Sequence, residues 1–270
     1  MTIDSAANLR SKNCRWRAQL TGEHPLLLAS VDAIDATDGS STRRRFTIAC
    51  ESLGVTKTKE RDWWRRVETS YTEPSRHYHT LVHIDAMLTL ASEHELQDSV
   101  AVDLATIFHD VVYDAVAGGG GKNERESARV FVEFAHSTTM TQDRVNKVVQ
   151  WIERTWSHDG NGLDGDGRLF MDFDMSILGA EREAYALYAS QVRLEYDHVN
   201  WLYWRIGRSQ FLSSSTSKRV FSTPEFAGLE DKARENARAE CLKLRLELFV
   251  AACVAVAGLG VAGRVMLSLL

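Results

Sequence analysis

Histidine and aspartate side chains gather in one short part of the 270-residue sequence, between residues 76 and 114. His83 lies in a segment whose apolar residues recur at helical spacing. His109 and Asp110 stand side by side in a second segment that is almost continuously apolar. Both side chains need partners there, because an unpaired buried polar group costs about 2–7 kcal/mol. A divalent cation bound by His83, His109 and Asp110 would supply them.

The order of these residues resembles that of the HD superfamily of metal-dependent phosphohydrolases, in which a lone histidine precedes an adjacent His-Asp pair and a distant aspartate. The chain is most similar to a group known as predicted metal-dependent HD-superfamily phosphohydrolases, over roughly residues 63–244. A distant similarity links Tyr78 to His83 with class I cyclic-nucleotide phosphodiesterases, which carry asparagine where this chain has Thr80. The blocks that carry the resemblance are Trp64, Tyr71, Arg76 to His79, His83, Phe108 to Asp114, Asn123, Glu124, Ser127, Ala128, Asp172, Asp174, Leu178, Gly179 and Ala233 to Asn236.

The resemblance implies an all-α HD-domain helical bundle with a fourth protein ligand to the metal. Asp174 precedes a Met-Ser pair much as the closing aspartate of the family precedes Leu-Ser, so we expect it to join His83, His109 and Asp110. Two imidazoles and two carboxylates suit an octahedral Mn²⁺, Mg²⁺, Fe²⁺ or Zn²⁺ ion, and the site would hold one or two such ions. The ion would lower the pKa of a bound water and hold a phosphoryl oxygen. The expected activity is hydrolysis of a small phosphate ester, for which a nucleotide is the first choice.

Three residues between positions 76 and 110 receive roles in this chemistry. His79 is four residues before His83, which predicts that both lie on one face of a helix. The phosphodiesterase-like pattern implies that His79 is the general acid that protonates the leaving oxygen. Arg76 is a bidentate donor, and we expect it to contact the phosphate of the substrate. Asp110 has a catalytic role beside its role as a ligand, since it can hydrogen-bond the water.

Two interpretations remain open for each of two later polar residues. Glu124 is either a catalytic carboxylate that orients a ligand histidine or the metal water, or an acid that favours a helix N-terminus. His158 is either a substrate-binding histidine near the metal, as the resemblance implies, or a helix cap. Asp172 alternates with Asp174 among bulky apolar residues, so the two cannot both be ordinary surface residues, and Asp172 is a candidate to support the metal ligands.

Composition excludes several classes of function. The chain is 44% hydrophobic and 26% charged, as expected of a soluble globular protein. Its net charge of -5 and pI near 6.0 give no electrostatic reason to expect nucleic-acid binding. None of the 4 cysteines forms a C-x-x-C pair, which favours free thiols in a reducing compartment. Residues 1–15 contain no apolar run, so we expect no secretory signal peptide and a cytoplasmic protein.

Hydrophobic periodicity and turn residues predict the domain organisation. We expect a disordered N-terminus over residues 1–15, an HD-type helical domain over 16–245 and an apolar C-terminal helix over 246–270. Within the domain we expect a helical hairpin (16–28 and 46–53, with a loop at 38–41), helices over 123–136 and 143–156, a mobile loop over 159–167, one long helix over 181–204, a polar loop over 213–217 and an amphipathic helix over 225–244.

The C-terminal segment has a different character from the rest of the chain. No charged residue occurs from Leu248 to Gly263. A helix that crosses a membrane needs about 20 apolar residues, so this run is slightly short. We expect the segment to project from the domain and to anchor it to a membrane with the active site in the cytosol. A tail that is buried, disordered or paired with a second copy in a homodimer is the alternative.

Two other functions are compatible with the same residues. A diiron HD-type oxygenase would need further ligand histidines between Asp110 and Asp174, where the sequence offers His136 and His158. A catalytically silent metal-binding module is the second alternative, and the four intact candidate ligands argue against it.

Overall fold

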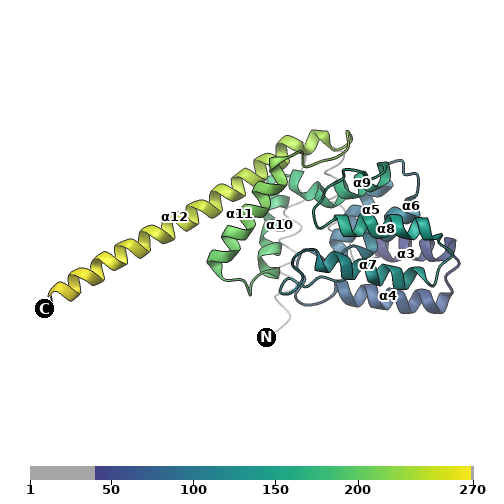
Figure 1. The fold of residues 1–270 in the computed structure, drawn as a ribbon, viewed down its shortest axis with the longest axis horizontal. Helices are drawn as coiled ribbons and strands as arrows, with labels where there is room; N and C mark the ends of the chain where they lie inside the picture. The colour runs from purple at the N-terminus through teal and green to yellow at the C-terminus, as the bar shows by residue number, and fades with distance from the viewer. Residues whose placement is uncertain (1–39, 269–270) are drawn as a thin grey trace, which may run out of the picture.

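The computed structural model describes residues 40–268, with side chains up to residue 254, and every regular element in this range is helical. Ten α-helices, labelled α3 to α12, follow one another along the described chain (Figure 1). Two short 3₁₀ helices, η2 (Ser176–Gly179) and η3 (Ala227–Leu229), join the later helices. The expected all-α class is therefore confirmed.

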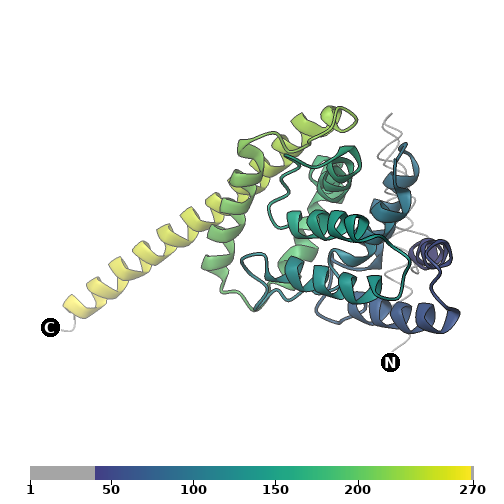
Figure 2. The same cartoon turned by 45° about the vertical axis from the view of Figure 1, so that its right-hand side comes forward.

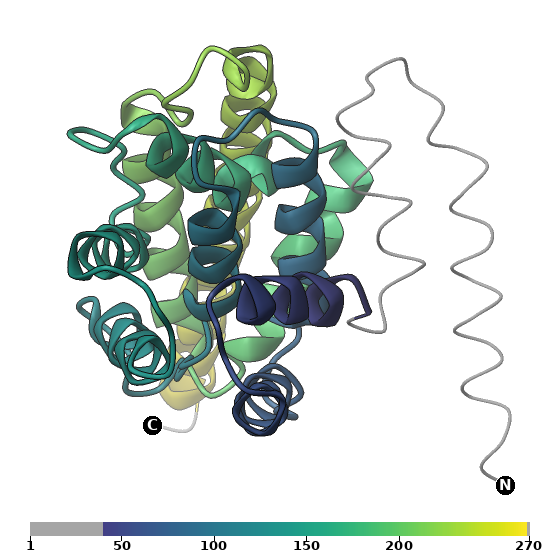
Figure 3. The ribbon, with the colours of Figure 1, turned by 90° about the vertical axis from the view of Figure 1, so that its right-hand side faces the viewer.

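Seven of the helices form a bundle around α6. Phe108 at its end packs against Phe46, Phe131 and Phe134 from neighbouring helices. Helix α6 contacts α3, α5, α7, α8 and α9, and Figure 3 shows α7 and α8 side by side and end-on. The seven helices are α3 (Ser40–Ser52), α4 (Lys57–Tyr71), α5 (Leu81–Ser92), α6 (Ser99–Phe108), α7 (Lys122–Ala135), α8 (Gln142–Arg154) and α9 (Gly165–Met175).

Side-chain caps determine where the helices that carry the site begin. The Thr80 hydroxyl accepts the backbone N–H of Val82 and so starts α5 at Leu81. His79 consequently lies before the helix, and the expectation that it shares a helix face with His83 is wrong. Similar side-chain caps begin four other helices of the bundle; they are Thr56 for α4, Asp98 for α6, Thr141 for α8 and Asp164 for α9.

The elements expected after residue 159 need correction. The long helix expected over 181–204 is two helices, α10 (Arg182–Glu195) and α11 (Trp201–Ser217). Asn200 causes the break, because its side chain accepts the backbone N–H of Leu202 and caps a new helix. The polar loop expected over 213–217 is the end of α11, and α9 begins inside the loop expected over 159–167.

Helix α12 (Glu230–Ser268) continues without a break across the domain boundary expected at residue 245. Its first part packs against α11 and η2, and its second part extends away from the bundle (Figures 1 and 2). Leu246, Phe249 and Val254 are more than half exposed there. Among residues 40–254, whose side chains the structure describes, no helix has the length and apolar composition that crossing a membrane requires, and most of the anchor expected over 246–270 lies outside these residues.

Only part of the expected N-terminal elements lies within the residues that the structure describes. The disordered segment 1–15 and the first helix of the hairpin, 16–28, lie outside the described residues. The second helix is present as α3, but it begins at Ser40, within the loop expected at 38–41. Its buried face, which includes Phe46 and Cys50, covers the bundle next to α5 and α6.

Candidate metal centre

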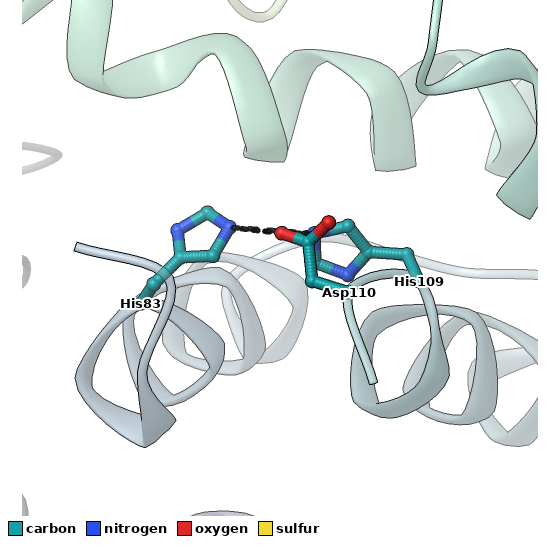
Figure 4. A group of neighbouring side chains, drawn as sticks. All are labelled: His83, His109 and Asp110. Carbon is teal, nitrogen blue, oxygen red and sulfur yellow. Dashed lines mark hydrogen bonds and ion pairs between the residues drawn. The ribbon is translucent and has the colours of Figure 1, made fainter. Parts of the chain in front are cut away.

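Three helix ends bring the four expected ligands into one place. His83 lies in the first turn of α5, His109 and Asp110 follow the last residue of α6, and Asp174 lies in the last turn of α9. Figure 4 shows the first three side chains pointing toward one another. Helix α9 can approach α8 closely because residue 167 is glycine: a Cβ there would lie 2.3 Å from the Trp151 indole nitrogen.

The distances between the candidate ligand atoms suit a shared ion. His83 Nε2 lies 3.4 Å from His109 Nε2 and 3.2 Å from Asp174 Oδ1. His109 Nε2 lies 3.0 Å from Asp110 Oδ2 and 3.8 Å from Asp174 Oδ1, and His83 Nε2 lies 4.0 Å from Asp110 Oδ2. Two atoms bound to one ion at about 2.0–2.3 Å can be at most about 4.6 Å apart. The buried group of His83, His109 and Asp110 can therefore hold a metal ion.

Hydrogen bonding orients one ligand histidine for metal binding. The Nδ1–H group of His109 donates to the carbonyl oxygen of Thr106 at 2.8 Å. One ring proton is thus fixed on Nδ1, so loss of the other leaves the lone pair of Nε2 directed at His83 and the carboxylates. The His83 and His109 Nε2 atoms face each other at 3.4 Å, and both can bind one ion when neither carries a proton. This donor set fits a cation between them.

The pKa values in the metal-free protein express the same close packing of charges. Burial alone would lower the pKa of His109, but the Asp110 and Asp174 carboxylates outweigh it and raise the pKa to about 9. Burial lowers the pKa of His83 and dominates there. Burial would raise the pKa of Asp110 and Asp174, yet the facing histidines hold both below the ordinary value. The carboxylates are thus ionised and ready to bind a cation.

His79 and Glu195 form a second pair beside the metal group. The His79 ring nitrogen Nδ1 lies 2.7 Å from Glu195 Oε2, and Tyr113 stacks on the ring with centroids 4.1 Å apart. The other oxygen of Glu195 accepts three backbone N–H groups at 2.7–2.9 Å, those of His77, Tyr78 and His79. Burial opposes a charged His79, but the Asp110 and Glu195 carboxylates raise its pKa.

Glu195 is the site residue that the sequence did not reveal. Arg193, two residues earlier, donates to the Tyr196 carbonyl and lies over the Trp204 ring. One signal was available: Tyr188, Val192 and Glu195 are spaced four and three residues apart, which puts the acid on the buried face of α10.

A cavity of about 410 Å³ opens beside the metal group, and Asp110, Asp174 and His79 are among its lining residues. His158 also lines it, with Nε2 3.1 Å from Asp174 Oδ2 and a left-handed backbone (φ 47°). Glu124 lines it from the first turn of α7, and its buried Oε2 has no hydrogen-bond partner in the described residues. Burial, assisted by Asp110, raises the pKa of Glu124. The structure thus brings both residues to the site, without distinguishing their roles.

The structure gives Arg76 a different task from the expected phosphate contact. Its guanidinium is buried and donates to the carbonyl oxygens of Asp110 at 2.6 Å and Val111 at 3.1 Å, with Nε 3.1 Å from a Glu73 carboxylate oxygen. It does not line the 410 Å³ cavity. Since its donors are occupied by the backbone that follows α6, Arg76 holds Asp110 in place and is not a substrate contact.

Asp172 does not support the metal ligands either. Its carboxylate accepts the backbone N–H of Ser222 at 2.7 Å and the backbone N–H and hydroxyl of Thr223 at 2.8 and 2.6 Å. These contacts tie α9 to the segment after α11. The expected metal-supporting role is therefore wrong, and the role of Asp172 is structural.

Neither models of protein families nor curated proteins nor solved structures include a match to this chain.

Proposed function

We propose that the protein is a metal-dependent phosphohydrolase of the HD superfamily that cleaves a small phosphate ester with a metal-activated water. The observation that carries this proposal is the meeting of His83, His109, Asp110 and Asp174 in one buried group. These residues come from three separate parts of the sequence, and a core histidine is normally satisfied singly. The resemblance of the motifs to the HD superfamily supports the same assignment.

In this proposal the ion is Mn²⁺, Mg²⁺, Fe²⁺ or Zn²⁺, and it lowers the pKa of a bound water and neutralises phosphoryl oxygens. Asp110 orients the attacking water through a carboxylate oxygen. Arg76 holds Asp110 in position by donating a hydrogen bond to its backbone carbonyl oxygen. Glu124 lines the same cavity with an unpartnered carboxylate oxygen, which suits it to accept a hydrogen bond from that water or to meet a second ion.

His79 is the general acid of the proposed reaction. Glu195 binds its Nδ1 atom and favours the protonated ring, so Nε2 is the atom that can donate a proton to the leaving oxygen. The stacked Tyr113 ring limits the orientation of the imidazole. His158, which contacts Asp174 and lines the cavity, is available to a phosphoryl oxygen of the substrate.

The diiron oxygenase remains the second candidate, and the positions of two histidines weaken it. His158 contacts Asp174, but His136 lies at the end of α7 in a different cavity beside Trp63. A second iron would thus have one further histidine within the described residues, not two. The silent binding module has no specific observation in its favour.

The proposal is tested by metal analysis of full-length protein purified without added metal, followed by a hydrolysis screen over nucleotides and other small phosphate esters, scored as release of phosphate or of the alcohol. We expect a divalent metal at one or two equivalents, release that a chelator abolishes, and no release by Asp110→Ala. Metal-free wild-type protein that gains no activity with any of the four ions would overturn the proposal. Consumption of oxygen without phosphate release would favour the oxygenase.

A further inference from the structure

Two cavities of unlike character meet at the candidate metal centre. The first is the 410 Å³ cavity described above, here called the aromatic cavity. The second, of about 700 Å³, lies between the loop that joins α8 to α9 and the end of α11, and is here called the basic groove. His158, Met175 and Phe211 line both. Because His158 contacts Asp174, the border between the two cavities lies beside the metal group.

Aromatic side chains form much of the lining of the aromatic cavity, and each basic side chain in that lining already has an acidic partner. Tyr78, Tyr188 and Trp204 are among the rings. The cavity's one arginine, Arg208, is buried and bound to both oxygens of Glu240, at 2.9 and 3.1 Å. An aromatic group can bury its faces here at little desolvation cost, whereas a second phosphate would find no unpaired arginine or lysine in the lining.

The basic groove has the opposite character. Arg168, Lys218 and Arg219 line it, and none of them has an acidic partner within 4 Å in the part of the chain that the structure describes. Its acid, Asp159, lies 4.0 Å from Arg154. Serine hydroxyls add donors, and the Trp156 side chain, 60% exposed, stands at its edge. Unpaired cations beside hydroxyl donors suit a phosphate group.

We propose that the substrate is a phosphodiester with two unlike arms, an aromatic arm in the aromatic cavity and a phosphate-bearing arm in the basic groove. This inference rests on the proposed function. The water oxygen bonds to the bridging phosphorus while the bond from phosphorus to the oxygen of the aromatic arm breaks. His79, which lines the aromatic cavity, gives its proton to that oxygen and regains one from the water. The products are an aromatic alcohol and a monoester that keeps the phosphate-bearing arm.

The kinetic test uses two 4-nitrophenyl phosphodiesters, one with a methyl group as its second arm and one with a 3-phosphopropyl group. We expect full-length metal-loaded protein to prefer the phosphate-bearing ester by about tenfold or more in kcat/KM, because bonds to a charged group are the strong ones. In the double variant Arg168→Gln/Arg219→Gln the ratio of the two kcat/KM values should fall toward one. Arg44→Gln, an exposed arginine on α3, is the matched control and should keep the wild-type ratio.

A binding measurement gives a readout that does not depend on turnover. Calorimetric titration with propane-1,3-diol bisphosphate should show a Kd about tenfold weaker in the double variant, with phenylphosphonate binding reduced much less. Equal hydrolysis of both esters by wild-type protein, or a ratio that the double variant leaves unchanged, overturns the two-arm inference and leaves the phosphohydrolase intact. Hydrolysis of neither ester by protein that is active in the screen described above overturns the two-arm inference alone, whereas inactivity in that screen and on both esters overturns the proposed function as well.

Discussion

The two aspartates of α9 show how differently one helix can use the same side chain. Asp172 and Asp174 are two residues apart, so they point to different sides of the helix. Asp172 meets two backbone N–H groups and one hydroxyl, and each of these donors needs an acceptor. Asp174 meets the imidazoles of His83 and His158 and faces a cavity. Burial of a carboxylate does not identify a ligand; the chemistry of the groups around it does.

The pKa values of the two carboxyl groups support this contrast. Burial raises the pKa of Asp172 despite its three hydrogen bonds. The histidines around Asp174 overcome the same burial and lower its pKa. The side of α9 that carries Asp172 therefore stabilises the fold, and the side that carries Asp174 places a carboxylate where a cation can bind.

The largest effect should follow from removing the ligand. Asp174→Ala should empty the metal site and reduce phosphate release to background, because one of four donors and the partner of His83 and His158 are lost. Metal content and release from refolded protein provide the measurement. Full metal occupancy in this variant would contradict the assignment of Asp174 and remove the contrast between the two sides of α9.

The ring of His79 has a structural contact as well as a place in the cavity. Glu195 binds its Nδ1 atom, and the residue also lines the aromatic cavity. His79→Ala should retain the metal and lose about 10²- to 10⁴-fold in kcat, the usual contribution of a general acid. Metal content measured beside kcat separates the two roles. If the variant loses the metal, His79 is a ligand and its assignment as the acid is wrong.

The structural side of α9 should respond in stability. Asp172→Ala leaves the N–H groups of Ser222 and Thr223 without an acceptor, and we expect a loss of about 3 kcal/mol in the free energy of unfolding. Denaturant unfolding of the chelated protein measures it. The fraction that remains folded should bind metal at the wild-type stoichiometry. A metal deficit in that fraction would show that the two sides of α9 are coupled.

The smallest effect is the pH dependence of metal binding. The neighbouring carboxylates raise the pKa of metal-free His109 to about 9, so its ring is protonated at neutral pH. An ion must displace that proton, and its affinity should therefore rise about tenfold per pH unit up to a pH of about 9. Competition titrations with a chelating dye over this range provide the test. A flat profile would mean that the imidazole is already neutral before the metal binds.

Sequence alone predicted the elements whose apolar periodicity is uninterrupted. Helices α7 and α8 lie close to their expected limits. The break between α10 and α11 was missed because aromatic residues continue on both sides of Asn200. The serine-rich end of α11 was assigned to a loop, but Thr216 bonds the Leu212 carbonyl and stays helical. Local hydrogen bonds of this kind leave little trace in hydrophobic periodicity.

The candidate site was predicted where unusual residues stand in apolar surroundings. His83, His109 and Asp110 could be selected for this reason, and the structure brings them together. Glu195 could not, because it meets His79 across 116 residues of sequence. Arg76 and Asp172 were expected at the site mainly from their residue types. Only the structure shows the backbone groups to which their side chains are hydrogen-bonded.

The contacts of Glu195 also determine the order in which parts of this chain can fold. Its carboxylate closes a loop that contains α5 to α9, since it binds the backbone just before α5 from the last residue of α10. When residues up to 180 of a nascent chain have left the ribosome, every candidate metal ligand is exposed. The three N–H groups before α5 still lack their acceptor, because Glu195 has not yet emerged. Closing a loop of this length is entropically slow, so α10 should dock late in folding. A nascent chain would acquire the acceptor for these three N–H groups, and the partner of His79, only after residue 195 has left the ribosome.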